Sequence, residues 1–205
     1  MSETKNQVLA KPDVLAKLRA LAQMQHTPAR TGTYSDMALH ERDRAAKFGD
    51  VPASKSVNWP VPGLLPNKDW KLVRVSSENS DNQKFGRNAI DGNPNTLWHT
   101  KFSGGVVPPP HELVIDLGAG VTIQGFVYLA RQDGSWNGAV KEIEFCLSDS
   151  PERFGAPVVR ATLTKTKAAQ EVKCPPTRGR YVLVRCLSEL SGNAFASMAE
   201  LGIKG

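Results

Sequence analysis

Short apolar runs separated by turn residues follow one another from Trp70 to the C-terminus. The runs are rich in β-branched and aromatic residues and are bounded by Gly, Asn, Asp and Pro, a pattern typical of strands. Few of them are long enough for a helix, so the sequence predicts an all-β fold, a jelly-roll β-sandwich. The predicted strands are residues 72–76, 113–117, 123–129, 140–147, 158–164, 170–174, 181–187 and 199–203.

Two of these runs also predict where their strands lie in the sheet. Residues 141–148 alternate between apolar and mostly polar side chains, which predicts one buried face and one face mostly in water. The run 181–186 is apolar on both faces apart from Arg185, which predicts a central strand. In the alternating run the inward set is Ile143, Phe145 and Leu147, and the outward set is Glu142, Glu144 and Cys146.

The N-terminal part of the chain is patterned differently. Behind Pro12, apolar residues recur at helical spacing over residues 13–25, which predicts one amphipathic helix. Residues 27–69 are polar and broken by prolines, apart from a helix-like piece at residues 35–47. The residues expected to pin the end of this segment to the next domain are Trp59, Leu64 and Leu65. The predicted organisation is a helical segment 1–30, a linker or wrapping arm 31–69, and a β-sandwich domain 70–205.

Length and charge narrow the class of protein. A chain of 205 residues can enclose one ordinary core plus a smaller appendage. The net charge of +6 is divided equally, +3 before Pro66 and +3 from Pro66 onward, so no basic stripe exists and nucleic-acid binding is not expected. No apolar run reaches the roughly 18 residues of a membrane span. The first ten residues lack the basic and then apolar pattern of an export signal.

The three cysteines match no zinc-binding spacing. Cys146 and Cys186 lie in apolar runs and are expected to be buried thiols, with a disulfide between them left open. Cys174 begins a Cys-x-Pro-x-Arg match to the sulfatase formylglycine motif, but it falls between two predicted strands and is followed by GRYVLV. No paired-aspartate metal segment accompanies it, so we expect no catalytic residues in this chain.

The block 88–100 reads NAIDGNPNTLWHT and carries the most chemistry. Asp91 and Gly92 form a tight turn that directs oxygen atoms inward, and Thr96 adds another oxygen. A hard cation such as Ca²⁺ takes about 6 to 8 oxygen ligands of this kind. A plain Asp-Gly turn is the structural alternative.

Together with later stretches, this block resembles the discoidin family, also called factor V/VIII C-type or F5/8 type C domains, in its bacterial carbohydrate-binding form. The similarity runs in order over residues 70–205, and the further stretches are PHELVIDLG (110–118), YLARQDGSWNG (128–138), GRYVLVRC (179–186) and SMAELGI (197–203). The resemblance implies a galactose-binding-like β-sandwich with a structural Ca²⁺. Its implied ligands are Asn88, Asp91, Asn93, Thr96, Ala199 and Glu200.

The same resemblance implies a galactose-type glycan site, including sulfated glycans, on His99, Arg131 and Asn137. An imidazole, a guanidinium and an amide can together hold neighbouring sugar hydroxyls, which both donate and accept. Trp136 or Phe195 is expected to supply the aromatic platform for an apolar sugar face. The structural alternative is a capped histidine, a surface ion pair and a hydrophobic plug.

A second resemblance concerns the N-terminal arm. Residues 3–28 are similar to the closing segment of bacterial arylsulfatases, which implies a sulfatase catalytic domain as partner and a secreted, periplasmic or cell-surface context. The expected function is therefore a non-catalytic glycan-binding module. The alternatives left open are an adhesion domain that binds protein or phospholipid and a fragment of an active sulfatase.

Overall fold

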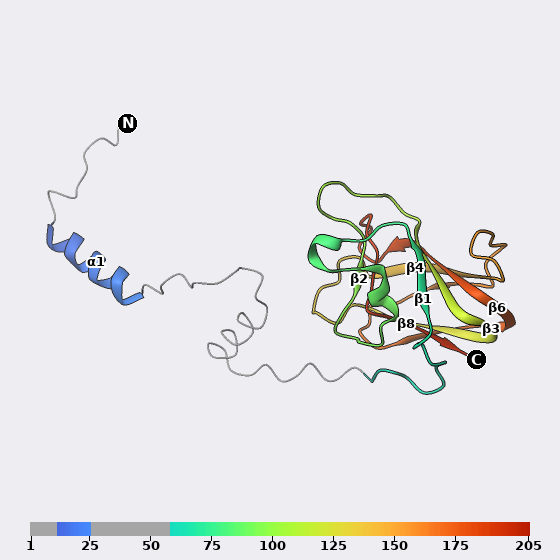
Figure 1. Cartoon of the computed structure of the whole chain (residues 1–205). Helices are drawn as coiled ribbons and strands as arrows, with labels where there is room; N and C mark the ends of the chain where they lie inside the picture. The colour runs from blue at the N-terminus through green and yellow to red at the C-terminus, as the bar shows by residue number, and fades with distance from the viewer. Residues whose placement is uncertain (1–11, 26–57) are drawn as a thin grey trace. The chain divides into compact units, whose positions relative to one another are not determined.

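The structure, a computed structural model of the chain, describes residues 12–25 and 58–205. The chain divides into two compact units, Met1–Ala53 and Ser54–Gly205. In the first unit, α1 (Pro12–Gln25; Figure 1) confirms the predicted helix. The exposed apolar side chains of this helix are Val14, Leu18, Leu21 and Met24. Among the described residues no helix is both long and apolar enough to cross a membrane. The helix-like piece 35–47, and residues 3–11 and 26–28 of the sulfatase-like arm, lie outside the described residues.

The second unit is an antiparallel β-sandwich, as the sequence predicts. Its main sheet places five strands in the order β1 (Lys71–Val75), β3 (His111–Leu129), β6 (Gln170–Glu189), β4 (Val140–Ser148) and β5 (Val159–Thr162). A sixth strand, β8 (Glu200–Lys204), pairs with the second half of β3. Two short strands, β2 (Trp98–His99) and β7 (Ser197–Met198), pair with each other. The predicted central strand is therefore confirmed, because the 181–186 run lies in β6.

Two strands are longer than the sequence predicts. The runs 113–117 and 123–129 belong to one strand, β3, and the runs 170–174 and 181–187 belong to one strand, β6, which pairs with β3 along both halves (Figure 1). The pairing shifts register between Asp116 and Val121, where glycines stand at positions predicted to form a turn. Register shifts of this kind bend a strand, so β3 pairs with β1 along its first half and with β8 along its second half.

The main core fills the space inside the sandwich. Trp98, Tyr128 and the stacked rings of Phe126 and Phe145, whose centroids lie 4.1 Å apart, are fully buried there. Two short 3₁₀ helices, η1 (Ser80–Asn82) and η2 (Gly86–Ile90), lead from β1 to β2. These helices carry the chain to the loops that hold the predicted site residues.

The outer face of β4 differs from its prediction. Glu144 was expected mostly in water but is buried, whereas the burial of Cys146 confirms the predicted buried thiol and contradicts only its place on the water-facing side. Cys146 joins Val114 and Leu183 in a second apolar cluster that Phe154 covers. Glu144 is held between Arg185 and Arg160, at 2.6 and 2.7 Å. The alternating pattern therefore assigned the side chains of β4 to the correct faces, but the face expected in water is covered by Phe154 and two arginines.

The three cysteines are free thiols. Cys186 belongs to the main core, whereas Cys146 belongs to the outer cluster. These clusters lie on opposite faces of the sheet, so the disulfide left open between the two residues does not form.

Residues 58–70, here called the strap, pack against β8. The Leu65 amide donates to the Ile203 carbonyl at 2.8 Å, and Leu64 forms a bridge with Lys204. A Cβ placed on Gly202 would lie 2.7 Å from Leu64 and 3.0 Å from Trp59, so the strap sits directly on the backbone of β8. The strap therefore holds to the sheet through the residues expected to pin it.

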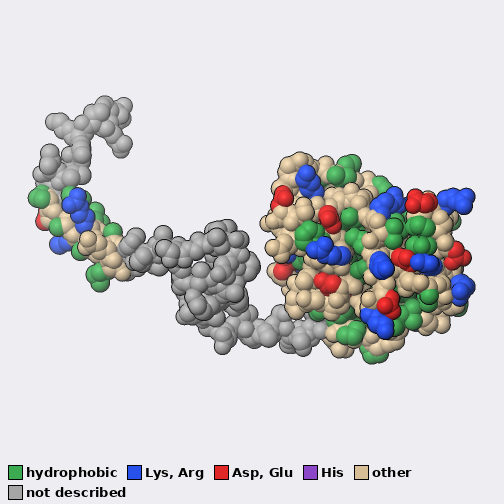
Figure 2. Space-filling view, viewed as in Figure 1, with side chains coloured by type: hydrophobic (Ala, Val, Ile, Leu, Met, Phe, Trp, Pro, Cys, Tyr) green, Lys and Arg blue, Asp and Glu red, His purple; other side chains and the backbone are tan. Residues whose placement is uncertain are grey.

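Charges of both signs mix on the surface. Figure 2 shows Lys and Arg side chains interspersed with Asp and Glu on the visible face of the β unit. Across the sheet, Arg185 bonds to Glu112 at 2.8 Å as well as to Glu144, so adjacent strands alternate in charge. This face has no stripe of a single sign.

Candidate functional site

Pairing between β2 and β7 brings the predicted sugar-site residues to one end of the sandwich. His99 stands opposite Ser197, and the Ser197 amide donates to the Gly138 carbonyl at 2.6 Å. Gly138 has φ +79°, and a Cβ there would lie 2.9 Å from the Ala196 backbone. Only glycine fits this approach. The loops that carry Asn137 and Phe195 are thereby held beside His99.

His99 is buried with a defined tautomer. Its Nδ1 lies 2.7 Å from the Thr100 carbonyl and must donate to it, which leaves Nε2 as an acceptor. Nε2 faces the Asn137 side-chain amide, whose Nδ2 donates to it at 3.2 Å. Burial is the main cause that lowers the pKa of His99, and the charges of Arg131 and Lys84 lower it further. The imidazole is therefore neutral at pH 7.

Arg131 is fixed beside this pair. Its Nε and Nη2 donate to the two carboxylate oxygens of Asp133 at 2.7 and 2.6 Å, and its Nη1 donates to the Asn137 carbonyl at 2.7 Å. A guanidinium carries five N–H groups, so two remain for other partners. Asp133 thus aligns Arg131 while it balances its charge.

Aromatic rings surround His99. Phe102 meets it edge-on, with ring centroids 5.0 Å apart, and Phe195 lies at 5.6 Å. Trp136, predicted as an alternative platform, is half-buried: it packs against the core and has the Lys167 ammonium 3.9 Å from its ring centroid. The aromatic side chains in contact with the imidazole are therefore Phe102 and Phe195.

The arrangement suits a polyol. One imidazole nitrogen accepts, two guanidinium N–H groups donate, and the exposed Asn137 amide can do both. Sequence reasoning missed Asp133 and the place of Phe102 beside His99. An Asp two residues after Arg131 was the signal for the first. Nothing in the local pattern around Phe102 showed that its ring meets His99.

A second group of predicted residues meets at the turn after η2. The Asp91 carboxylate accepts from the Asn93 amide at 2.8 Å and from the Thr96 hydroxyl at 2.7 Å. Gly92 has φ +79°, the left-handed conformation that lets the turn close. The turn lies against Glu200 at the start of β8, so the Asp91 carboxylate helps to raise the pKa of the Glu200 carboxyl.

Glu200 is the least compensated polar side chain near this turn. It is 0% exposed, and neither carboxylate oxygen has a hydrogen-bond partner among the described residues. Burial and the neighbouring Asp91 carboxylate raise the pKa of Glu200 to about 9. A buried carboxylate beside another carboxylate is unfavourable unless a cation or a proton balances it.

The oxygen chemistry of this turn fits Ca²⁺. Asp91 and Glu200 would hold it as carboxylates, and the remaining ligands would be neutral oxygens, because the described residues contain no group of three or more His, Cys, Asp or Glu side chains placed to share a metal. Ala199, whose carbonyl is another predicted ligand, directly precedes Glu200, and its amide donates to the Leu129 carbonyl at 2.9 Å. The other predicted oxygen donors from the same turn are Asn88, Asn93 and Thr96.

Comparison with known proteins identifies the family. The profile described as F5/8 type C domain matches residues 73–201, more than half of the chain. The chain belongs to the F5/8 type C domain family. The match contains every residue predicted for both sites, whereas the strap precedes it.

Two curated proteins share this domain. A sialidase of Micromonospora viridifaciens is 36% identical over 146 residues, which are 70% of this chain and 22% of that protein. A galactose oxidase of Gibberella zeae is 30% identical over 145 residues, 70% of this chain and 21% of that protein. The F5/8 type C chain therefore spans about a fifth of the length of these relatives.

Solved structures of carbohydrate-binding modules share the fold. The module CpGH89CBM32-5 of Clostridium perfringens, in complex with GalNAc-β-1,3-galactose, is 29% identical, with a TM-score of 0.63 over 69% of this chain and 99% of that one. The family 32 module of C. perfringens NanJ, in complex with galactose, is 23% identical, with a TM-score of 0.60 over 70% of this chain and 98% of that one. The described β unit thus has the fold of family 32 carbohydrate-binding modules.

Proposed function

We propose that this F5/8 type C domain is a non-catalytic module that binds galactose-type glycans at His99, Arg131 and Asn137. The observation that carries the proposal is the convergence of these three side chains. They lie together beside the ring of Phe195, and this group of side chains is called the sugar rim below. His99 offers an acceptor, Arg131 offers donors, and the Asn137 amide offers both. The 29%-identical module that binds a galactose-containing disaccharide supports the same ligand class.

Two neighbouring sugar hydroxyls would bind this rim. His99 Nε2 would accept from one hydroxyl, and the free N–H groups of Arg131 would donate to the next. Asn137 would release its bond to His99 and turn to the ligand, while Phe195 would cover the apolar sugar face. Such a shallow site makes few contacts, so affinity for one sugar should be millimolar to high micromolar, about 4 to 6 kcal/mol.

We include sulfated galactosides among the proposed ligands, because a positively charged side chain without an ion pair lies beside the sugar rim. Arg131 is paired with Asp133, but Lys84 has no ion pair among the described residues. The Lys84 backbone carbonyl accepts from the His99 amide at 3.2 Å, so its side chain starts beside the site. A sulfate ester would place a negative charge where Lys84 can reach it.

We also propose that Ca²⁺ binds between Asp91 and Glu200. It would supply the charge that balances the two carboxylates and would tie the turn after η2 to the first residue of β8. This role is structural, because none of the proposed sugar-binding residues is among the proposed Ca²⁺ ligands. Its support is the pair of unpartnered Glu200 oxygens.

The chain would serve a larger enzyme. The matched residues make up only 22 and 21% of its curated enzyme relatives, which supports a role in holding a catalytic domain near its glycan. We propose a sulfatase-type catalytic domain as that partner, because of the N-terminal arm, and a secreted, periplasmic or cell-surface setting.

Calorimetry tests the glycan proposal. Galactose, N-acetylgalactosamine and galactose 6-sulfate are titrated into the wild-type chain, Asn137→Ala and Lys84→Gln. We expect Asn137→Ala to weaken binding of all three sugars by about tenfold, the loss of one to two hydrogen bonds. Lys84→Gln should weaken only the sulfated sugar. The proposal fails if no sugar binds the wild-type chain, or if Asn137→Ala binds as tightly as the wild type.

A second candidate is binding to phospholipid through the loop after β2. Phe102, Val106 and Val107 are 43, 51 and 41% exposed there, beside the sugar rim. Pelleting with phosphatidylserine vesicles, compared for the wild type and Phe102→Ser, separates this function from glycan binding.

A further inference from the structure

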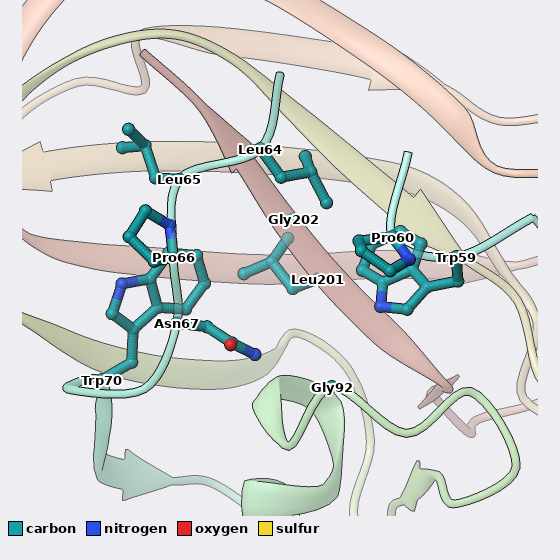
Figure 3. Close-up of a pocket in the computed structure, with 10 residues that line it drawn as sticks. All are labelled: Trp59, Pro60, Leu64, Leu65, Pro66, Asn67, Trp70, Gly92, Leu201 and Gly202. Atoms are coloured by element: carbon teal, nitrogen blue, oxygen red, sulfur yellow. The ribbon is translucent and has the colours of Figure 1, made fainter. Parts of the chain in front are cut away.

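A cavity of about 250 Å³ lies between the strap and β8, apart from the sugar rim. Figure 3 shows Trp70, Pro66 and Asn67 on one side of it, Trp59 and Pro60 on the other, and Leu201 between them. Both indole rings are only half-buried. The cavity is therefore a pocket flanked by aromatic rings rather than a flat apolar patch.

Most of this pocket is built from residues outside the family match. The strap residues that line it precede residue 73, where the match begins, and the floor is formed by Gly92 in the turn after η2 and by Leu201 and Gly202 in β8. The sugar rim at His99 and Arg131 is made from other elements. The pocket thus lies apart from the sugar-binding residues, and most of its lining precedes the family match.

The walls of the pocket are held firmly in place. Asn67 Nδ2 donates to the Ile90 carbonyl at 3.0 Å, which joins one wall to η2. Trp59 and Leu64 lie so close to Gly202 that a Cβ there would not fit. A preformed pocket binds its ligand without first ordering its own side chains.

The polar groups of the pocket are few and complementary. With Nδ2 engaged, Asn67 keeps its Oδ1 as an acceptor. The Trp59 and Trp70 indoles each carry one N–H donor, and neither donates to another described residue, in contrast to Trp98, whose Nε1 donates to Ser77 at 2.9 Å. An acceptor among apolar and aromatic faces matches a ring that has C–H faces and equatorial hydroxyls.

We propose that this pocket is a second carbohydrate-binding site that accepts one pyranose unit between Trp59 and Trp70. Its volume lies below the roughly 300 to 1,000 Å³ of sites for drug-sized ligands, which favours a single sugar ring. Aromatic rings stack on the C–H face of a pyranose, and Asn67 Oδ1 accepts from a hydroxyl. The proposal does not depend on the His99 site, because the two sites share no side chain.

Indole N–H resonances test this proposal in the intact chain. The four tryptophans, Trp59, Trp70, Trp98 and Trp136, give separate signals in ¹⁵N-labelled protein. The probes are the methyl glycosides of galactose, glucose, mannose and N-acetylglucosamine. We expect at least one of them to shift the Trp59 and Trp70 signals saturably, while Trp98, buried and bonded to Ser77, stays in place.

Variants separate the two sites. Asn137→Ala, which disables the first site, should leave the Trp59 and Trp70 shifts unchanged. Trp59→Leu keeps an apolar cover on Gly202 and should abolish the Trp70 shift, whereas Trp59→Phe should retain it with affinity reduced severalfold. An unmoved Trp98 signal reports that each variant is folded. Should Trp59→Leu unfold, Asn67→Ala on the opposite wall serves instead and should weaken binding severalfold.

Two results would overturn the second site. One is that none of the four glycosides moves the Trp59 and Trp70 signals. The other is that the Trp70 shift is as large and saturates as readily in Trp59→Leu or Asn67→Ala. Failure of the first site alone would leave the Trp59 and Trp70 shifts intact.

Discussion

Replacing Glu200 by Gln should remove the response of this domain to calcium. The side chain is 0% exposed and both of its oxygens lack hydrogen-bond partners among the described residues, while Asp91 lies beside it. Gln keeps the shape and removes one charge. The site would then have one carboxylate for a divalent ion, and its affinity for Ca²⁺ should fall steeply.

The magnitude follows from linkage between binding and folding. At a free Ca²⁺ concentration of about 100 times Kd, the wild-type domain gains about 2.7 kcal/mol. A domain of the size of residues 58–205 shifts by about 2 to 4 °C per kcal/mol, so its Tm should rise by about 5 to 11 °C. In EGTA, Glu200→Gln should melt above the wild type, because Glu200, whose pKa is raised to about 9 in the fold, must take up a proton or stay charged beside Asp91, and Gln needs neither.

Scanning calorimetry in excess Ca²⁺ and in EGTA measures both effects. Glu189→Gln is the matched control, because Glu189 is also buried but accepts from the amides of Gly138, Ser191 and Asn193. It should lower Tm in both buffers and keep the full calcium shift. The reasoning is refuted if Glu200→Gln retains that shift, or if wild-type Tm is identical in the two buffers.

Two further predictions concern stability. The Tyr128 hydroxyl donates to the Ser197 carbonyl and accepts from the Val140 amide, both at 3.1 Å in the core, so Tyr128→Phe should cost about 2 to 5 kcal/mol in urea unfolding; a loss below about 0.5 kcal/mol would contradict this. Burial lowers the pKa values of His99 and His111 from 6.5, so the folded state stays neutral where the unfolded chain takes up protons. Stability should therefore fall as pH drops below 6.5, by up to about 1.4 kcal/mol per pH unit and histidine, and His111→Gln should flatten the slope measured by unfolding between pH 5 and 7.

Local pattern determined much of the fold. The period-2 run at residues 141–148 and the doubly apolar run at 181–186 predicted an alternating strand and a central strand, because side-chain period is a property of the strand itself. The helix at 13–25 followed from apolar spacing in the same way. Motifs around Asp91 and Arg131 were sufficient to predict the family, which the match to residues 73–201 confirms.

Long-range contacts decided the rest. Asn137 lies 38 residues from His99, and the acceptor role of Nε2 depends on that contact and on the Thr100 carbonyl. Whether Trp136 faces a ligand or the core depended on where Lys167 lies, 31 positions later. No periodicity within either segment contains such information.

The same division explains the burial of β4 and the extent of β3. Cys146 and Glu144 are buried because Phe154 and two arginines from other segments cover that face, which alternation along β4 cannot show. β3 continues through its glycines because β6 pairs with it on both sides of the register shift. The sequence by itself determined most of the strand segments, the turn at Asp91 and the types of side chain available for binding. Tertiary structure decided which of them meet, because partners distant in the chain complete each hydrogen bond and each buried face.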